Sequence, residues 1–124
     1  MGKKVMVVDD ERDFLKIMKL NLEQGGKYEV LTLPTATDII SQVHQFRPDI
    51  ILIDLLMPKI GGIDACRLLN EDHVGKKIPI IVITALDKDK DQLDAYKSGV
   101  VDYLIKPVET DDLIAKIEKA LQYK

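Results

Sequence analysis

Five short apolar runs alternate with segments of helical spacing, and this alternation constrains the fold of the 124-residue chain more than any other feature. The runs cover residues 5–8, 30–33, 50–53, 80–84 and 102–105, and the helical segments cover residues 11–24, 35–46, 63–72, 87–98 and 110–122. Runs this short, continuous and rich in Val and Ile are typical of strands buried on both faces. The alternation therefore predicts an α/β domain with a parallel sheet and helices on both faces.

The order of the strands in such a sheet is restricted by the handedness of its connections. Crossovers between parallel strands are right-handed, and a doubly wound five-stranded sheet commonly has the order 2-1-3-4-5. A chain of 124 residues has the size of one domain and is long enough to bury one core. We therefore treat residues 1–124 as a single domain with this strand order.

Charge and hydropathy exclude several classes of function. The formal net charge is −3, so the chain carries no basic footprint for direct binding of nucleic acid. No apolar run approaches the roughly 20 residues that span a bilayer, and the first residues lack a signal-peptide pattern. Cys66 is the single cysteine, so it forms no internal disulfide and packs most simply as a small core residue. We expect a cytoplasmic domain that binds neither nucleic acid nor membrane.

Polar residues end or directly follow four of the five predicted strands. In chain order they are Asp9-Asp10, Asp54, Thr84 and Lys106. The carboxyl ends of parallel strands meet at one edge of a sheet, where ligands bind at the switch point of the strand order. Adjacent strands lie about 4.8 Å apart, so Asp54 should lie between the acidic pair and Thr84. The long side chain of Lys106 can reach the same place from one strand further away.

These residue types together favour phosphoryl chemistry. Carboxylates held this close repel one another unless one is protonated or a cation binds. Oxygen donors with no His or Cys beside them suit Mg²⁺ better than Zn²⁺. The Lys106 ammonium and the Thr84 hydroxyl are not needed for the metal, but they fit an anionic ligand such as a phosphoryl group. Asp54 is then the candidate nucleophile, with Mg²⁺ and Lys106 offsetting charge on the transferring oxygens.

The motifs at these strand ends resemble the response-regulator receiver domain of two-component signalling, over essentially the whole chain. They are the Asp9-Asp10 pair, the pattern D-x-x-M-P-x-x-x-G from Asp54 to Gly62, Thr84-Ala85, and residues 102–107. Each motif alone is weakly specific, whereas their order and their positions at the strand ends are highly specific. The family has the strand order 2-1-3-4-5.

The resemblance implies a chemical role for each acidic residue. Asp54 accepts a phosphoryl group from the phosphohistidine of a sensor histidine kinase or a phosphotransfer protein. Asp10, Asp54 and the backbone carbonyl of Leu56 ligate Mg²⁺ directly, and Asp9 acts largely through water. Such a domain is a signalling switch that catalyses only its own phosphorylation and slow dephosphorylation, rather than an enzyme that turns over an external metabolite.

The resemblance also implies how the signal is transmitted. Thr84 and Lys106 hold the phosphoryl oxygens, with help from the Ala85 amide, and Tyr103 is the aromatic switch that turns inward as Thr84 moves. The Lys106–Pro107 peptide bond is expected to be cis. The last helix, the fifth strand and the helix before it form the output surface, which is also a possible homodimer contact. The domain either stands alone or is the N-terminal part of a longer regulator.

Three alternatives compete with this interpretation. A phosphatase with an aspartyl-phosphate intermediate needs a second acid two residues after the nucleophile, where this chain has Leu56. A nucleotide- or flavin-binding module of similar fold needs a glycine-rich phosphate loop, which the sequence lacks. A degenerate receiver that serves only protein contacts is disfavoured by the full set of acidic, Thr and Lys residues.

Several residues receive minor assignments from the sequence. Asp10 is expected to cap the following helix, with Asp13 as a weak capping-box partner. Leu56 and Leu86 occupy positions that in the family control access of the hydrolytic water, and we hypothesise that they slow self-dephosphorylation. His44 and His73 are isolated in the sequence, so they are expected to be exposed and receive no role in metal binding or catalysis.

Overall fold

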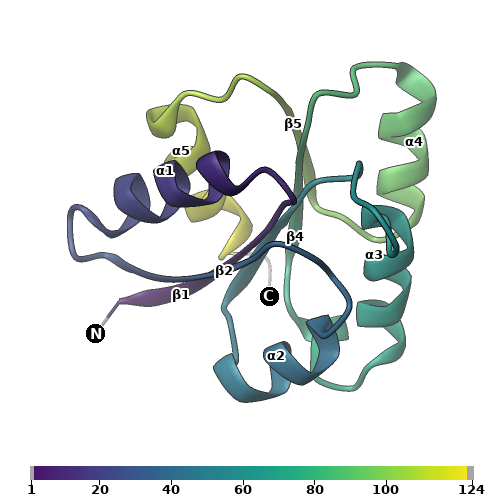
Figure 1. Ribbon diagram of the computed structural model, residues 1–124, viewed down its shortest axis with the longest axis horizontal. Helices are drawn as coiled ribbons and strands as arrows, with labels where there is room; N and C mark the ends of the chain where they lie inside the picture. Colours follow the sequence, from purple (N-terminus) through teal and green to yellow (C-terminus); the bar gives the residue numbers. More distant parts are fainter. Residues whose placement is uncertain (1, 123–124) are drawn as a thin grey trace.

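The computed structural model describes residues 2–122 and contains a five-stranded parallel sheet in the order β2-β1-β3-β4-β5 (Figure 1). The strands are β1 (Lys3–Val8), β2 (Tyr28–Leu33), β3 (Ile50–Ile53), β4 (Ile80–Thr84) and β5 (Asp102–Ile105). The helices are α1 (Arg12–Glu23), α2 (Ile39–Phe46), α3 (Gly62–Glu71), α4 (Asp89–Lys97) and α5 (Thr110–Ala120), with a short 3₁₀ helix η1 (Gly75–Lys77). The predicted fold class and strand order are confirmed.

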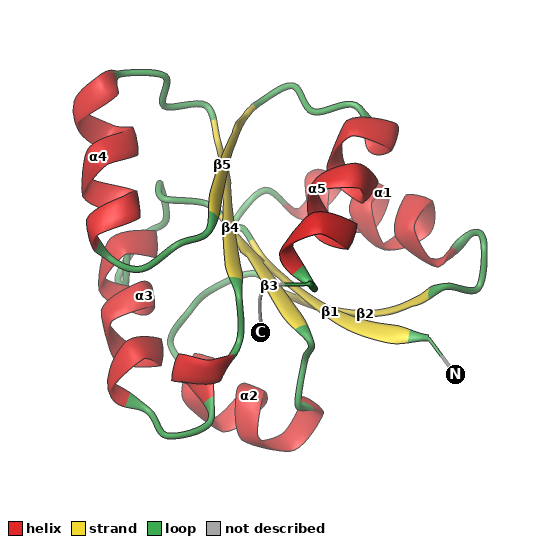
Figure 2. Cartoon of the chain, turned by 180° about the vertical axis from the view of Figure 1, so that it is seen from behind, coloured by secondary structure: helices red, strands yellow, loops and turns green. Residues whose placement is uncertain are grey.

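Helices cover both faces of the sheet, as the continuous apolar strands require. Helices α1 and α5 pack on one face, and α2, α3 and α4 pack on the other (Figures 1 and 2). Successive residues of β1 alternate between the two cores: Val7 packs on the α1/α5 side, and Met6 packs on the α2/α3/α4 side. Burial on both faces explains why β3 carries no polar residue and why the one polar residue of β4 is its last, Thr84.

The predicted boundaries agree with the structure to within two residues, with one exception. The helix predicted from residue 35 begins only at Ile39, so this prediction was wrong. The Thr37 amide donates a hydrogen bond to Thr35 Oγ1 at 3.3 Å, and the two threonine hydroxyls are 2.8 Å apart. These local bonds give the backbone an alternative to a helical turn.

The entry into α1 also differs from the prediction. Among residues 2–122, no side chain caps the N-terminus of α1, so the expected cap from Asp10 was wrong. Asp9 instead accepts a hydrogen bond from the Glu11 amide at 2.9 Å, and the side chain of Asp10 is exposed. The first acidic residue therefore turns inward and the second turns outward.

Helix α4 buries little apolar surface. Its inward residue is Ala95, whereas Leu93 and Tyr96 are exposed. Ile105, on the adjacent strand β5, is exposed as well. The edge formed by α4 and β5 thus presents large apolar side chains to solvent. In the part of the chain that the structure describes, no helix is long and apolar enough to cross a membrane.

Candidate functional site

Asp54 occupies the carboxyl end of β3, at the position that the sequence predicts. Its backbone amide donates to the Val8 carbonyl at 3.0 Å, which extends the β1–β3 pairing by one residue and fixes the side chain at the sheet edge. The carboxylate is 5% exposed. One of its oxygens accepts a hydrogen bond from the Leu56 amide at 3.1 Å, and the other faces Lys106. Asp54 is therefore a buried carboxylate with an oriented geometry.

Asp9 and Glu11 complete a cluster of three carboxylates with Asp54. One oxygen of each lies within 4.8 Å of the others. Asp9 is 1% exposed, and burial raises its pKa above the ordinary value, although hydrogen bonds from Lys106 and the Glu11 amide oppose the rise. Glu11 is more exposed and reaches the cluster from the start of α1. A cluster of this charge attracts a cation.

Lys106 links all three carboxylates from the end of β5. Its Nζ atom lies 2.8 Å from Asp9, 2.6 Å from Glu11 and 3.3 Å from Asp54. The ammonium also lies 4.2 Å from the centre of the Phe14 ring, a cation–π contact.

The environment of Lys106 keeps this side chain protonated. Burial would lower its pKa, but hydrogen bonds to Asp9 and Glu11 and the charge of Asp54 outweigh burial and raise the pKa. The Lys106–Pro107 peptide bond is cis, as expected.

Thr84 is the last residue of β4, and Tyr103 lies near the start of β5. Thr84 is fully buried, and its hydroxyl accepts a hydrogen bond from the Leu86 amide at 3.4 Å. The Tyr103 hydroxyl donates to the Leu86 carbonyl at 2.7 Å, and burial raises its pKa to about 12. The ring of Tyr103 is 9% exposed, so it lies in the inward position. Leu86 thus connects the threonine and the tyrosine.

Two predicted site residues, Asp10 and Leu56, lie outside the carboxylate cluster. The Asp10 side chain is exposed, and the cluster instead contains Glu11, which the sequence analysis did not select. Leu56 contributes its amide to Asp54, and its side chain is exposed. Glu11 follows the acidic pair directly, so its acidity was visible in the sequence. Its contact with Lys106, 95 residues away in the chain, was not visible.

The surroundings of Gly62 explain why the D-x-x-M-P-x-x-x-G pattern ends in a glycine. It is the first residue of α3, and its amide donates to the Leu55 carbonyl at 3.1 Å. A Cβ atom at this position would lie 2.7 Å from Leu55 Cα and would also strike the Asp54 backbone. The start of α3 can approach the loop after Asp54 this closely only because position 62 has no side chain.

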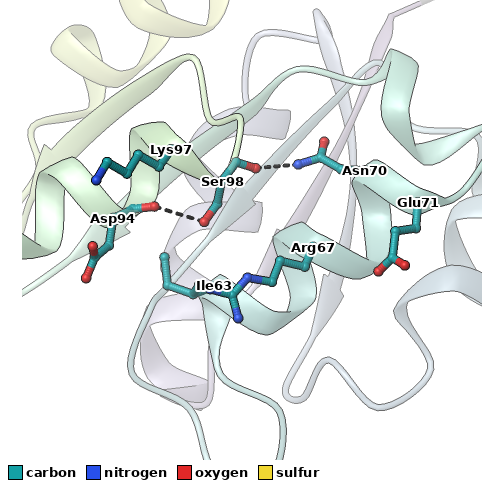
Figure 3. A pocket seen from close by; sticks show the side chains of 7 residues that line it. All are labelled: Ile63, Arg67, Asn70, Glu71, Asp94, Lys97 and Ser98. Carbon is teal, nitrogen blue, oxygen red and sulfur yellow. Dashed lines mark hydrogen bonds between the residues drawn. The ribbon is translucent and has the colours of Figure 1, made fainter.

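A separate pocket lies between α3 and α4, and none of Asp9, Glu11 and Asp54 lines it (Figure 3). Residues of both charges line it: Arg67 and Lys97 are cationic, and Glu71 and Asp94 are anionic. The polar groups at its centre are already paired. The Ser98 hydroxyl donates to the Asp94 carbonyl at 2.9 Å, and the Asn70 side chain donates to the Ser98 carbonyl. This pocket is therefore a hydrogen-bonded seam between two helices, and the carboxyl edge of the sheet remains the candidate site.

Comparisons with known proteins identify the family of this chain. A sequence model of the response regulator receiver domain family matches residues 5–118. The chain belongs to the response regulator receiver domain family. The chain is 31% identical over 122 residues to the alkaline phosphatase synthesis transcriptional regulatory protein PhoP of Bacillus subtilis, covering 98% of this chain. It spans 50% of the length of PhoP.

Solved structures show the same receiver fold. A two-component response regulator from Clostridium difficile has a TM-score of 0.90 at 24% identity, with 98% of each chain covered. The receiver domain of a sensor histidine kinase from Pseudomonas aeruginosa has a TM-score of 0.89 at 24% identity, with 98% of this chain and 99% of that chain covered. That structure has a magnesium ion coordinated in its active-site cleft. At these identities the likeness concerns the fold.

Proposed function

We propose that this receiver domain is a phospho-accepting switch in which Asp54 takes a phosphoryl group from a sensor histidine kinase or a phosphotransfer protein. The observation that carries the proposal is the convergence of three carboxylates, Lys106 and Thr84 at one edge of the sheet. In this proposal residues 1–124 act as a single domain. The domain catalyses only its own phosphorylation and slow dephosphorylation.

The proposed transfer requires a nucleophile and a means of offsetting charge. A carboxylate oxygen of Asp54 forms a bond to phosphorus as the bond from phosphorus to the donor imidazole nitrogen breaks, and the imidazole takes up a proton. Lys106, already beside Asp54, offsets charge on the transferring oxygens, and the Thr84 hydroxyl donates to one of them. In dephosphorylation, a water oxygen forms a bond to phosphorus as the bond from phosphorus to the Asp54 oxygen breaks. Inorganic phosphate leaves, and Asp54 is again a carboxylate.

The residues present fit a magnesium ion. All donors of the cluster are oxygens, and the three carboxylates outnumber the single ammonium of Lys106. We propose that Asp10, Asp54 and the Leu56 carbonyl ligate the ion, with Asp9 acting through water. The exposed side chain of Asp10 would have to turn toward the cluster, which it adjoins in the chain, to do so. The structurally similar receiver domain from Pseudomonas aeruginosa, which holds magnesium in its active-site cleft, supports a magnesium site of this kind. When bound, Mg²⁺ adds positive charge beside the phosphoryl oxygens.

We propose that Tyr103 transmits the effect of phosphorylation from Thr84 to the output surface. Its hydroxyl and the Thr84 hydroxyl both bond Leu86, so a shift of Thr84 toward the phosphoryl group acts on the backbone segment that holds the tyrosine. Tyr103 belongs to β5, next to the apolar edge described above. The proposed output is a homodimer formed through α4, β5 and α5.

A groove beside the acidic site offers a surface for the phosphodonor. Phe14, Ile17 and Met18 of α1 line it on one side, and Lys106 and Pro107 line it on the other. Ile17 is exposed, so the groove has an apolar rim next to the nucleophile. We propose that the histidine-bearing partner docks there. The proposed location is the cytoplasm, which fits the free, buried thiol of Cys66.

Intact-mass measurement tests the proposal. The protein is incubated with Mg²⁺ and a small phosphodonor such as acetyl phosphate, and we expect one added phosphoryl group on the wild type. Asp54→Asn keeps the side-chain shape and should remain unmodified. Asp64→Asn, at an exposed position of α3, is the matched control and should be modified like the wild type. Equal modification of wild type and Asp54→Asn, or no modification of either, would overturn the proposal.

A further inference from the structure

His44, Asp72 and His73 form a second cluster of metal-ligating groups, far from the carboxyl edge. His44 lies in the last turn of α2, and Asp72 caps the C-terminus of α3. Both helices end at the edge where β3 and β4 begin, which is opposite to the edge that holds Asp54. The expectation that the two histidines are isolated was therefore wrong, because the fold brings α2 and α3 together.

His44 and Asp72 form the hydrogen-bonded half of this cluster. The Nε2 atom of His44 lies 2.9 Å from each carboxylate oxygen of Asp72. Asp72 is in turn held by the Val74 and Gly75 amides, which donate to its Oδ2 atom at 3.0 and 2.8 Å. These bonds, with that from His44, lower the pKa of Asp72 to about 2, so the carboxylate is ionised at neutral pH. Backbone bonds of this kind orient metal ligands in proteins.

His73 supplies the third donor. Its ring centre lies 5.3 Å from that of His44 in an edge-on arrangement, and one ligand atom from each of the three residues lies within 4.8 Å of the others. His73 is exposed, so its ring can rotate at little cost. Tetrahedral zinc with bonds of about 2.0–2.1 Å needs donors about 3.3 Å apart. The 2.9 Å separation of His44 and Asp72 must open slightly, and His73 must move toward them, to provide this spacing.

We propose that His44, Asp72 and His73 bind a transition-metal dication such as Zn²⁺. Two imidazoles and one carboxylate are a donor set suited to Zn²⁺, Cu²⁺ or Ni²⁺ and unsuited to Mg²⁺. The fourth coordination position of the metal would be open to water, because His73 and part of His44 face solvent. A simple ion pair accounts for His44 and Asp72 but leaves the second imidazole unexplained. The site thus selects a different class of ion from the carboxylates at the opposite edge.

Cationic side chains lie in the segments that adjoin this cluster. Arg47 donates from Nε to the His44 carbonyl at 2.9 Å, and η1 carries Lys76 and Lys77. These cations oppose non-specific collection of divalent ions. Bound metal would tie the end of α2 to the end of α3 and would favour the folded state by mass action.

Calorimetric titration of untagged protein with Zn²⁺ at neutral pH tests the proposal. The sequence has only two histidines, so His44→Gln and His73→Gln remove the imidazole donors one at a time. We expect one Zn²⁺ per wild-type chain and at least about tenfold weaker binding in each variant. Zinc should also raise the melting temperature of the wild type by about 3 °C or more, and excess Mg²⁺ should not compete.

Asp54→Asn is the control for binding at the carboxylate cluster. It should bind Zn²⁺ as tightly as the wild type, because it leaves the histidines intact. Absence of wild-type binding at about 1 mM Zn²⁺, which lies at the weak limit of specific affinity, would overturn the proposal. Unchanged affinity in either histidine variant, or loss of binding in Asp54→Asn, would overturn it equally.

Discussion

Lys106 is the residue on which the resting state of the acidic site depends. Its ammonium contacts Asp9, Glu11 and Asp54 at once, and its side chain is 13% exposed. The lysine therefore acts as an internal counter-ion for carboxylates that would otherwise repel one another. A divalent cation and this ammonium are expected to compete for the same oxygens.

Removal of this ammonium should strengthen magnesium binding. In Lys106→Met the carboxylates lose their positive neighbour, so Mg²⁺ affinity should rise by about tenfold or more. Lys106→Arg keeps the charge and should bind Mg²⁺ nearly as the wild type does. Calorimetric titration with Mg²⁺ measures the difference. Equal affinity in the Met and Arg variants would show that Lys106 does not compete with the cation.

Asp72 should make the stability depend on pH in the acid range. Its pKa is lowered from the ordinary value of 3.8 to about 2, chiefly by the hydrogen bond from the Gly75 amide and then by that from His44. The folded state thus prefers the charged form. The contribution is fully present above pH 3.8 and is lost as the pH falls toward about 2.

Denaturant unfolding of wild type and Asp72→Asn at several pH values measures this contribution. Asn keeps an acceptor for the backbone amides but carries no charge. The stability difference between the two proteins should therefore shrink as the pH falls from about 4 to about 2. A difference that stays constant across this range would contradict the assignment to the Asp72 charge.

At the scale of elements, the start of α3 and the loop that leaves β3 depend on each other. Gly62 lies against the backbone of Asp54 and Leu55, so the first turn of α3 packs directly on the loop that leaves β3. Gly61, one residue earlier, has φ −72° and ψ 166°, values that any residue adopts. A Cβ atom at Gly61 would meet only the Leu55 carbonyl oxygen, at 3.5 Å.

The two neighbouring glycines give a matched pair of variants. Gly62→Ala should destabilise the domain by about 1–3 kcal/mol, because the new methyl group forces α3 away from the loop. Gly61→Ala should change stability by less than about 0.5 kcal/mol. Chemical denaturation in the absence of Mg²⁺ measures both. If the two variants are equally stable, the contact between α3 and the loop does not require a glycine.

At the scale of the whole molecule, the apolar side chains left exposed on α4 and β5 form one edge of the domain. Leu93 is 54% exposed, Tyr96 is 45% exposed and Ile105 is 42% exposed. This edge begins where Tyr103 links β5 to the segment after Thr84. The position suits an output surface that responds to events at Asp54.

This edge should support dimerisation after phosphorylation. Sedimentation velocity of the acetyl phosphate-treated protein with Mg²⁺ is expected to show a dimer that Leu93→Ser or Ile105→Ser weakens by about tenfold or more. Leu20→Ser, at an exposed position of α1, is the matched control and should not change the affinity of the dimer. A phosphorylated wild type that stays monomeric, or equal loss in the control, would exclude this surface.

Much of this molecule was predictable because local patterns specify it. The continuous apolar runs identified all five strands, and the polar residues at their ends located Asp9, Asp54, Thr84 and Lys106 at one edge. Parallel pairing then brings those ends together whatever the loops do. The late start of α2 was missed because side-chain bonds within residues 35–37 override the apolar spacing.

The tertiary structure alone decided which side chains meet. Asp9 turns inward and Asp10 outward, Glu11 joins the cluster, and Lys106 bridges carboxylates carried by β1, α1 and β3. His44 meets Asp72 only because α2 and α3 end side by side. These contacts join residues 28 to 97 positions apart, so their energies depend on packing that no local pattern records. Sequence periodicity determines where the strands lie and which edge of the sheet carries the polar residues at their ends. Packing determines which side chains contact one another.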